Sequence, residues 1–217
     1  MSKRIFVKAV LMDGMLATRP ADDEIYSKYV ASKAPDAPSF NEEVEARGAE
    51  DVINNAMCIF SRQGEDVFMW DYHIKGYLKE ICGALRRMPS EDLAKTSLKV
   101  KAYKKIIDSS IAVFPRKIIL HIPEDEGITV CERPLRADTP QGERVALAAS
   151  EEVPAGTTFE FQIMCDDSHV DWMLDLLDFG RYKGLGQWRN SGKGRFSVET
   201  KISSVSFRPE RRSTVVD

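Results

Sequence analysis

The chain has 217 residues, of which 43% are hydrophobic and 30% charged, and its formal net charge is −3. This composition is typical of an ordinary globular protein, and no apolar run is long enough to cross a bilayer, so we expect no membrane-spanning segment. The slightly negative charge excludes a uniformly basic nucleic-acid-binding protein. Any contact with a polyanion must come from a local basic surface, because a charge acts mainly within a Debye length of about 8–10 Å. The length favours one elaborated domain over residues 1–217.

The four cysteines indicate reduced thiols. They are widely separated and form no C-x-x-C pair, so neither a zinc site nor a disulfide framework is predicted: Cys58, Cys82, Cys131 and Cys165. We therefore expect a cytoplasmic protein without a bound metal or cofactor.

The first predicted element is a strand at residues 3–11, where apolar and β-branched residues alternate with polar ones until Asp13-Gly14 breaks the run. Residues 22–33 have helical character, which Pro35 stops. The chain is acidic from residue 41 to residue 66. Together these patterns predict a helical, acidic insertion over about residues 22–70.

The middle of the chain contains two predicted helical stretches and two predicted strands. In residues 74–87 apolar side chains recur at intervals of three and four, which predicts a helix with one buried stripe. A second amphipathic stretch covers about residues 90–110. Residues 117–122 and 128–133 then read as two strands of a hairpin-like unit joined by the turn at residues 123–127.

The last third has the clearest pattern. Residues 157–164 alternate as a half-buried strand, and Asp167 or Ser168 can cap the helix that follows. A glycine-rich loop comes next, and residues 196–199 and 202–207 supply further strand before a polar tail. The order strand, helix, loop, strand is half of a β-α-β-β-α-β arrangement. We therefore predict an α+β protein with a ferredoxin-like (RRM-like) core, insertions and a C-terminal glycine-rich loop.

The loop between Arg181 and Arg195 carries five cationic side chains and no acidic one, together with Tyr182 and Trp188. Glycines let phosphates approach the backbone amides, cations neutralise phosphate charge, and an aromatic ring can stack on a base. The alternative interpretation is a tight turn with a solvated basic surface, in which Trp188 anchors the core. No P-loop motif occurs, and a dinucleotide-binding loop is disfavoured because this loop follows a helix and leads into a strand.

Three segments, in the same order, resemble the RAMP superfamily, especially the RNA-binding backbone subunits of type III CRISPR effector complexes. Residues 184–196 (Gly-Leu-Gly-Gln-Trp-Arg-Asn-Ser-Gly-Lys-Gly-Arg-Phe) are similar to the family's C-terminal glycine-rich loop. Residues 74–86 resemble its lysine-bearing helix, and residues 150–161 its entry into the penultimate core strand. The residues from Trp70 to His73 depart from the family pattern of small residues.

The resemblance implies an RRM-like core that binds one RNA strand through backbone contacts, often with copies side by side. It also implies partners from a CRISPR-like complex, and this acidic chain can be a stand-alone relative from a mobile element or virus. On this basis we predict a protein that binds single-stranded RNA or another nucleic acid through these residues: Lys75, Lys79, Arg181, Lys183, Gly184, Gly186, Trp188, Arg189, Gly192, Lys193, Gly194 and Arg195.

Catalysis is the less favoured interpretation. Some members of the superfamily cleave RNA with an aspartate and a metal or with a histidine. The candidates here are His73 and Asp13, but neither lies in a recognisable catalytic spacing. A metal-dependent or histidine-dependent endoribonuclease therefore remains an alternative. A third is a decoy or assembly protein that acts on a CRISPR-like or other defence complex, or that sequesters a small nucleotide.

Overall fold

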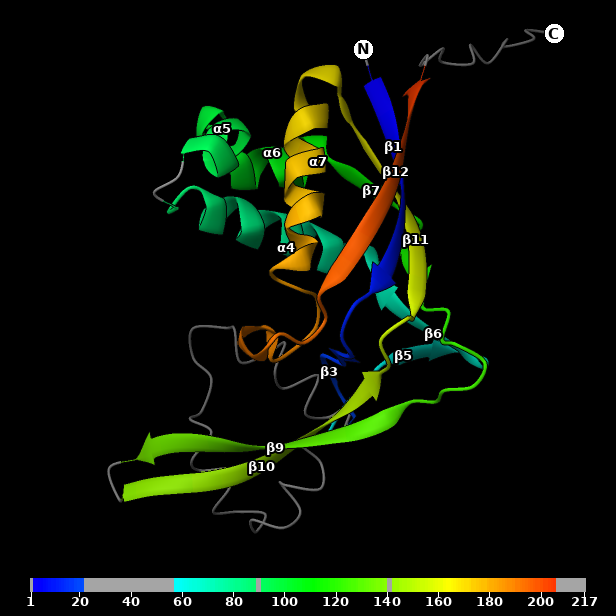
Figure 1. The fold of residues 1–217 in the computed structure, drawn as a ribbon, viewed down its shortest axis with the longest axis vertical. Helices are drawn as coiled ribbons and strands as arrows, with labels where there is room; N and C mark the ends of the chain where they lie inside the picture. The colour runs from blue at the N-terminus through cyan, green and yellow to red at the C-terminus, as the bar shows by residue number, and fades with distance from the viewer. Residues whose placement is uncertain (1, 22–56, 89–90, 140–141, 206–217) are drawn as a thin grey trace, which may run out of the picture.

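A computed structural model describes residues 2–21, 57–88, 91–139 and 142–205. Its central element is a four-stranded antiparallel sheet in the order β12-β1-β11-β7. The strands are β1 (Ser2–Leu11), β7 (Ala112–Phe114), β11 (Thr158–Asp166) and β12 (Phe196–Val205). Figure 1 shows the three long strands side by side, with helices on one face.

The alternation of apolar and polar residues in the sequence gives this sheet one buried and one exposed face. Along β1 the side chains of Ile5, Val7, Ala9 and Leu11 are buried, while the residues between them point to the other face. Ile5 pairs with Ile163 of β11 and with Ile202 of β12, so the register aligns apolar positions across the central strands.

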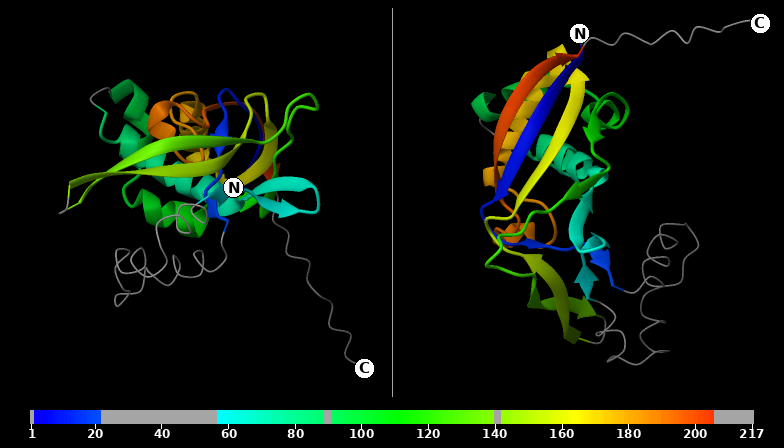
Figure 2. Two further views of the ribbon diagram at one scale, coloured as in Figure 1. Left: turned by 90° about the horizontal axis from the view of Figure 1, so that it is seen from below. Right: turned by 90° about the vertical axis from the view of Figure 1, so that its right-hand side faces the viewer.

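Two helices cover the buried face of the sheet. They are α4 (Asp71–Leu85) and α7 (Val170–Asp178), and the right-hand view of Figure 2 shows the helices behind the sheet. The apolar stripe predicted at three- and four-residue spacing is the buried side of α4. The Tyr77 hydroxyl donates a hydrogen bond of 2.8 Å to the carbonyl of Leu176, which joins the two helices.

The shorter helices α5 (Glu91–Lys99) and α6 (Tyr103–Ser110) complete the helical layer. They occupy the second amphipathic stretch predicted from the sequence. Chain order through the core, counting the two long helices, is therefore strand, helix, strand, strand, helix, strand: α4, followed by α5 and α6, lies between β1 and β7, and α7 lies between β11 and β12. The predicted α+β class is confirmed.

The predicted hairpin of residues 117–122 and 128–133 is wrong. The first segment is β8 (Lys117–Ile119), which pairs with β6 (Asp66–Trp70) through Phe68 and Ile119. The second belongs to β9 (Thr129–Thr139), which pairs with β10 (Gly142–Val153) instead. A longer antiparallel ladder with β10 satisfies more backbone groups than a short pairing with β8 could.

The β9–β10 hairpin extends away from the central sheet (Figure 1). The base of β10 also pairs with β2 (Met15–Leu16) and β4 (Cys58–Ile59), and β4 pairs with β3 (Arg19–Pro20). These contacts tie the hairpin to the segment that follows β1.

The predicted helical insertion at residues 22–70 falls largely outside the described residues, because residues 22–56 are not among them. The described part is not helical: residues 57–70 contain β4, β5 (Ser61–Gln63) and β6. The apolar run from Val67 to Met69 is buried in the β5-β6-β8 sheet, and this burial favours the extended conformation there.

All four cysteines are free thiols. None of the helices in the described ranges combines the length and the apolar character needed to span a bilayer. Across the same ranges, no cluster of three or more histidine, cysteine, aspartate or glutamate side chains is arranged to hold a metal ion.

Candidate nucleic-acid interface

The glycine-rich loop connects α7 to β12 and lies against the segment that follows β1. Backbone hydrogen bonds join the two: Gly194 donates to the Gly14 carbonyl at 2.9 Å, and Met12 donates to the Arg195 carbonyl at 2.7 Å. Gln187 donates to the carbonyl of Leu16 at 3.3 Å. The main chain therefore holds the loop in a defined shape.

Three of the predicted glycines are required for packing. A Cβ added to Gly184 would lie 2.0 Å from the carbonyl carbon of Gly194, and one added to Gly194 would lie 2.0 Å from the Leu185 oxygen. Both residues are buried. A Cβ added to Gly186 would lie 2.4 Å from the Leu16 carbonyl oxygen, so of these four glycines only Gly192, with a φ of +88° and no neighbouring atom closer than 3.8 Å to such a Cβ, leaves its backbone open to a ligand.

Trp188 is exposed at the surface of the loop. Its side chain retains 43% of its accessible area, so it does not anchor the core. Its backbone has φ 53° in the left-handed region, which is unusual for a bulky residue. The ring lies over the guanidinium of Arg133 at 5.6 Å from carbon to ring centroid. The loop thus presents one aromatic face beside a cation.

Arg133, on β9, is a site residue that the sequence analysis missed. It is only 8% exposed, and its Nη2 donates to the Gln187 side-chain oxygen. Its Nη1 is buried without a hydrogen-bond partner, and no ion pair joins Arg133 to any carboxylate in the described ranges. Burying a cation without a counter-ion costs free energy. The uncompensated charge of Arg133 also adds positive electrostatic potential beneath Trp188.

Every cation of the loop itself forms an ion pair with a carboxylate. Lys193 binds Glu152 and Arg195 binds Asp13, each at 2.6 Å. The other contacts join Lys183 to Glu80 at 2.6 Å, Arg189 to Glu80, and Arg181 to Asp178 at 3.1 Å.

Glu80, on α4, is the one carboxylate in this set that binds two loop cations. Burial opposes ionisation of Glu80, but the hydrogen bonds and charges of Lys183 and Arg189 outweigh it and lower the pKa of this carboxyl. Hydrogen bonding to Asp13 similarly raises the pKa of Arg195. The positive charge of the loop is therefore largely balanced by the carboxylates around it.

A cavity of ≈ 930 Å³ lies between the loop, the start of α4 and the strands β2 to β6. It brings together three of the predicted site residues, Gly186, Arg189 and His73. The other predicted residues are not among those that line it, and these include the two lysines of α4. Lys79 forms an ion pair with Asp108 of α6, and Lys75 has no ion pair or hydrogen bond with another described residue.

His73 and Asp13, the two catalytic candidates, do not share this cavity. His73 lines it, and its Nε2 lies 3.4 Å from the Thr18 hydroxyl oxygen. Burial lowers the pKa of His73, although the nearby Asp71 acts in the opposite direction, so the imidazole is neutral at pH 7. Asp13 instead accepts the hydrogen bond from Arg195.

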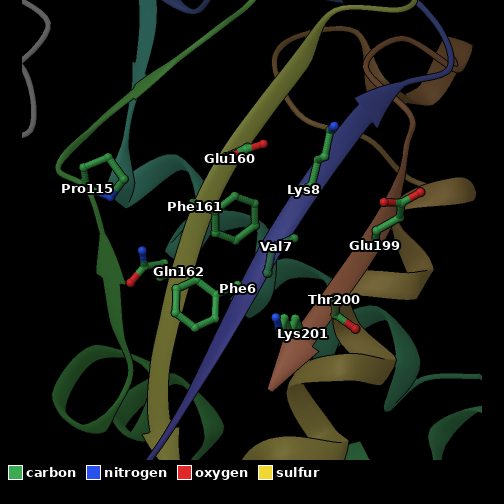
Figure 3. Close-up of a pocket in the computed structure, with 10 residues that line it drawn as sticks. All are labelled: Phe6, Val7, Lys8, Pro115, Glu160, Phe161, Gln162, Glu199, Thr200 and Lys201. Atoms are coloured by element: carbon green, nitrogen blue, oxygen red, sulfur yellow. The ribbon is translucent and has the colours of Figure 1, made fainter. Parts of the chain in front are cut away.

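The outer face of the central sheet is a second candidate surface for single-strand binding, because RRM domains stack bases on that face. A hollow of ≈ 450 Å³ there is lined by Phe6 and Lys8, among others (Figure 3). Register places Lys8 between Glu160 and Glu199, so acidic side chains flank its charge. Phe6 is the only aromatic residue that the two central strands direct to this face in the described structure, because Phe159 and Phe161 are buried in the core. This face is less suited to a polyanion than the loop.

No protein-family model matches the sequence, and no curated protein matches it significantly. Among solved structures, the chain is similar to a chain in the cryo-EM structure of the type III-B Cmr-beta complex bound to cognate target RNA, with a TM-score of 0.52 and 10% sequence identity. That alignment covers 93% of this chain and 60% of the other, so this chain spans less than two thirds of the other chain's length. A chain of a type IV-B CRISPR complex aligns with a TM-score of 0.46 and 14% identity, over 96% of this chain and 94% of the other. The resemblance indicated by the sequence is thus confirmed at the level of the fold, which this protein shares with a chain of a type III-B CRISPR complex.

Proposed function

We propose that this protein binds single-stranded nucleic acid, RNA in particular, on the surface formed by the glycine-rich loop and the neighbouring cavity. The observation that carries the proposal is that Gly186, Arg189 and aromatic side chains of β6 and α4 line one cavity of ≈ 930 Å³, and that the exposed Trp188 directly precedes Arg189 on the loop. The aromatic residues are Phe68, Trp70 and Tyr72. Single-strand sites combine cations that follow the backbone with rings on which bases stack.

The core of this proposed RNA-binding protein is ferredoxin-like, as in the RAMP superfamily. The sheet order β12-β1-β11-β7 and the placement of one helix after β1 and another after β11 support this assignment. In that arrangement the last strand follows the glycine-rich loop and lies beside the first, so the loop sits at the end of β1.

We expect binding of a nucleic-acid strand to exchange the carboxylate partners of the loop cations for phosphates. In the free protein, Glu80 and Glu152 occupy positions beside Arg189 and Lys193 that phosphates would take in the complex. These pairs are partly exposed, so each contributes no more than about 1 kcal/mol and can be replaced by a charge-assisted contact to phosphate. Arg133 supplies positive charge that no carboxylate in the described structure offsets.

The shared fold also supports partners of the CRISPR type. The similar chain belongs to an assembly described as bound to cognate target RNA, and we propose that this protein likewise acts with an RNA strand and with CRISPR-like subunits or further copies of itself. Light scattering with and without RNA measures self-association directly. A strictly monomeric RNA complex would contradict the multimeric part of the proposal.

Two alanine variants test the interface. Arg189→Ala and Lys193→Ala should each weaken binding of a labelled single-stranded oligonucleotide, regardless of its sequence. Each should also flatten the dependence of log K on log salt by about 0.7, the value for one phosphate on a single strand. Lys3→Ala is the matched control, because Lys3 is also ion-paired, to Asp167 at 3.5 Å, but lies at the start of β1, outside the loop. Unchanged binding in both loop variants would contradict the proposed interface.

A second candidate function is RNA cleavage at the same cavity. It is favoured by His73, a neutral imidazole that lines the cavity 3.4 Å from the Thr18 hydroxyl oxygen and could accept a proton. Incubation of RNA with and without Mg²⁺ distinguishes binding from cleavage. Cleavage that His73→Ala abolishes would support the nuclease, and RNA that stays intact under both conditions would reject it for those substrates.

A further inference from the structure

Three aromatic residues follow one another along β6 and into the first turn of α4. Phe68 and Trp70 are two positions apart on the strand and therefore share a face. Their ring centroids are 5.1 Å apart in an edge-on contact. The ring of Tyr72 is nearly parallel to that of Trp70, with an interplanar angle of 13° and a centroid distance of 6.3 Å. The rings of Phe68, Trp70 and Tyr72 thus form an aromatic row that runs from β6 into the start of α4.

Two cations from the neighbouring chain segment lie over this row. The guanidinium carbon of Arg116 is 5.7 Å from the centroid of Trp70, and the Lys117 ammonium is 5.1 Å from that of Phe68. The Arg116 side chain is 75% exposed. Arg116 also lies 3.9 Å from the Asp71 carboxylate, so the positive charge at the edge of the aromatic row comes mainly from Lys117, and it favours a polyanionic ligand over a neutral one.

The aromatic row and the glycine-rich loop face the same cavity. Phe68, Trp70 and Tyr72 line it together with Gly186 and Arg189. Its volume of ≈ 930 Å³ is at the upper end of the ~300–1,000 Å³ range of ligand pockets. Tyr72 remains 48% exposed there. A bound nucleic-acid strand whose phosphates lie on the loop can therefore turn a base toward Tyr72.

We infer that Tyr72, backed by Trp70, is a stacking platform for an unpaired base of the bound strand. The inference rests on the proposed function, since it assigns the base-binding part of the same interface. The edge of His73 packs against Tyr72 at 4.6 Å between centroids and fixes its ring. Because every base has a flat π-face, the platform accepts any base and adds affinity without sequence preference.

The test compares a normal single-stranded oligonucleotide with an abasic strand of the same length, both labelled, on the full chain. Tyr72→Ala should weaken binding of the normal strand about 5- to 150-fold and leave binding of the abasic strand unchanged. Tyr72→Phe keeps the ring and should bind both strands like the unsubstituted protein. Phe114→Ala is the matched control, because Phe114 is also 48% exposed but lies on β7, outside the cavity.

The outcomes separate this inference from the proposal on which it rests. Normal binding of the base-bearing strand by Tyr72→Ala, or an equal loss on both strands, would overturn the stacking platform and leave the loop interface intact. A protein that binds neither strand would overturn both. A Tyr72→Ala variant that loses a protein partner while it retains the oligonucleotide would identify the row as a protein-docking surface and would also overturn the inference. Circular dichroism of each variant checks that the fold is retained.

Discussion

Glu80 restrains two cations of the loop at once, so Glu80→Gln should turn a balanced loop into a more basic one. The amide keeps the shape of the side chain and removes its charge, which releases Lys183 and Arg189 from their common partner. If the loop binds phosphates, removal of this competitor should tighten binding. If the ion pairs only stabilise the fold, the same change should leave binding unchanged.

The size of the effect follows from the number of released cations. Each additional phosphate contact on a single strand steepens the plot of log K against log salt by about 0.7, which is about fivefold in affinity at ~0.1 M salt relative to 1 M. Two released cations therefore predict binding that is about 5- to 25-fold tighter at ~0.1 M salt. Both pairs are partly exposed, so their loss should reduce the free energy of unfolding by less than about 2 kcal/mol in total.

Fluorescence anisotropy of a labelled single-stranded RNA, titrated at several salt concentrations, measures both the affinity and the slope. Asp167→Asn is the control, because it removes the same charge and releases Lys3 at the far end of β1. Equal tightening in Glu80→Gln and Asp167→Asn would show a general charge effect. Unchanged or weaker binding in Glu80→Gln would refute the idea that Glu80 occupies a phosphate position.

Two further predictions concern stability. The pKa of His73 is lowered by burial from its ordinary value of 6.5, so the folded state binds fewer protons than the unfolded state below that pH and stability falls on acidification. Urea unfolding at about pH 7 and about pH 5.5 should show a smaller loss for His73→Gln than for the unsubstituted protein, and an identical loss would contradict the assignment. Gly194→Ala should lower the free energy of unfolding by more than about 1 kcal/mol, because the new Cβ would lie 2.0 Å from the Leu185 oxygen at a φ of +72°. Gly64→Ala, at φ +62° with open space around it, should cost less, and thermal melts that rank the two variants in the reverse order would show that the close packing of the loop is unimportant.

Local patterns predicted much of the fold. The alternation in β1 and β11 and the helical stripe of α4 are properties of neighbouring residues, and the structure contains these elements within a few positions of the predicted bounds. The partner of β9 was predicted wrongly, because no strand was predicted over most of β10, which follows β9 directly in the chain and offers a longer ladder than β8.

The site was predicted only in part. The loop, its cations and its tryptophan were visible as a sequence pattern, but the sequence left open whether Trp188 is exposed or anchors the core. The carboxylates that pair with those cations were not visible, because Asp13 lies 182 residues from Arg195 and Glu80 lies 109 residues from Arg189. Arg133 was missed because nothing near it in the sequence marks it as a partner of Trp188. These contacts depend on how the folded chain brings the loop, α4 and the hairpin together.

Photocrosslinking of a single-stranded RNA that carries 4-thiouridine, with mapping of the crosslinked peptides, tests the central claim most directly. The account predicts crosslinks in the glycine-rich loop around Trp188 and at Tyr72, with a yield that falls as salt is raised. Crosslinks confined to the outer face of the sheet at Phe6, or none at any salt concentration, would contradict it.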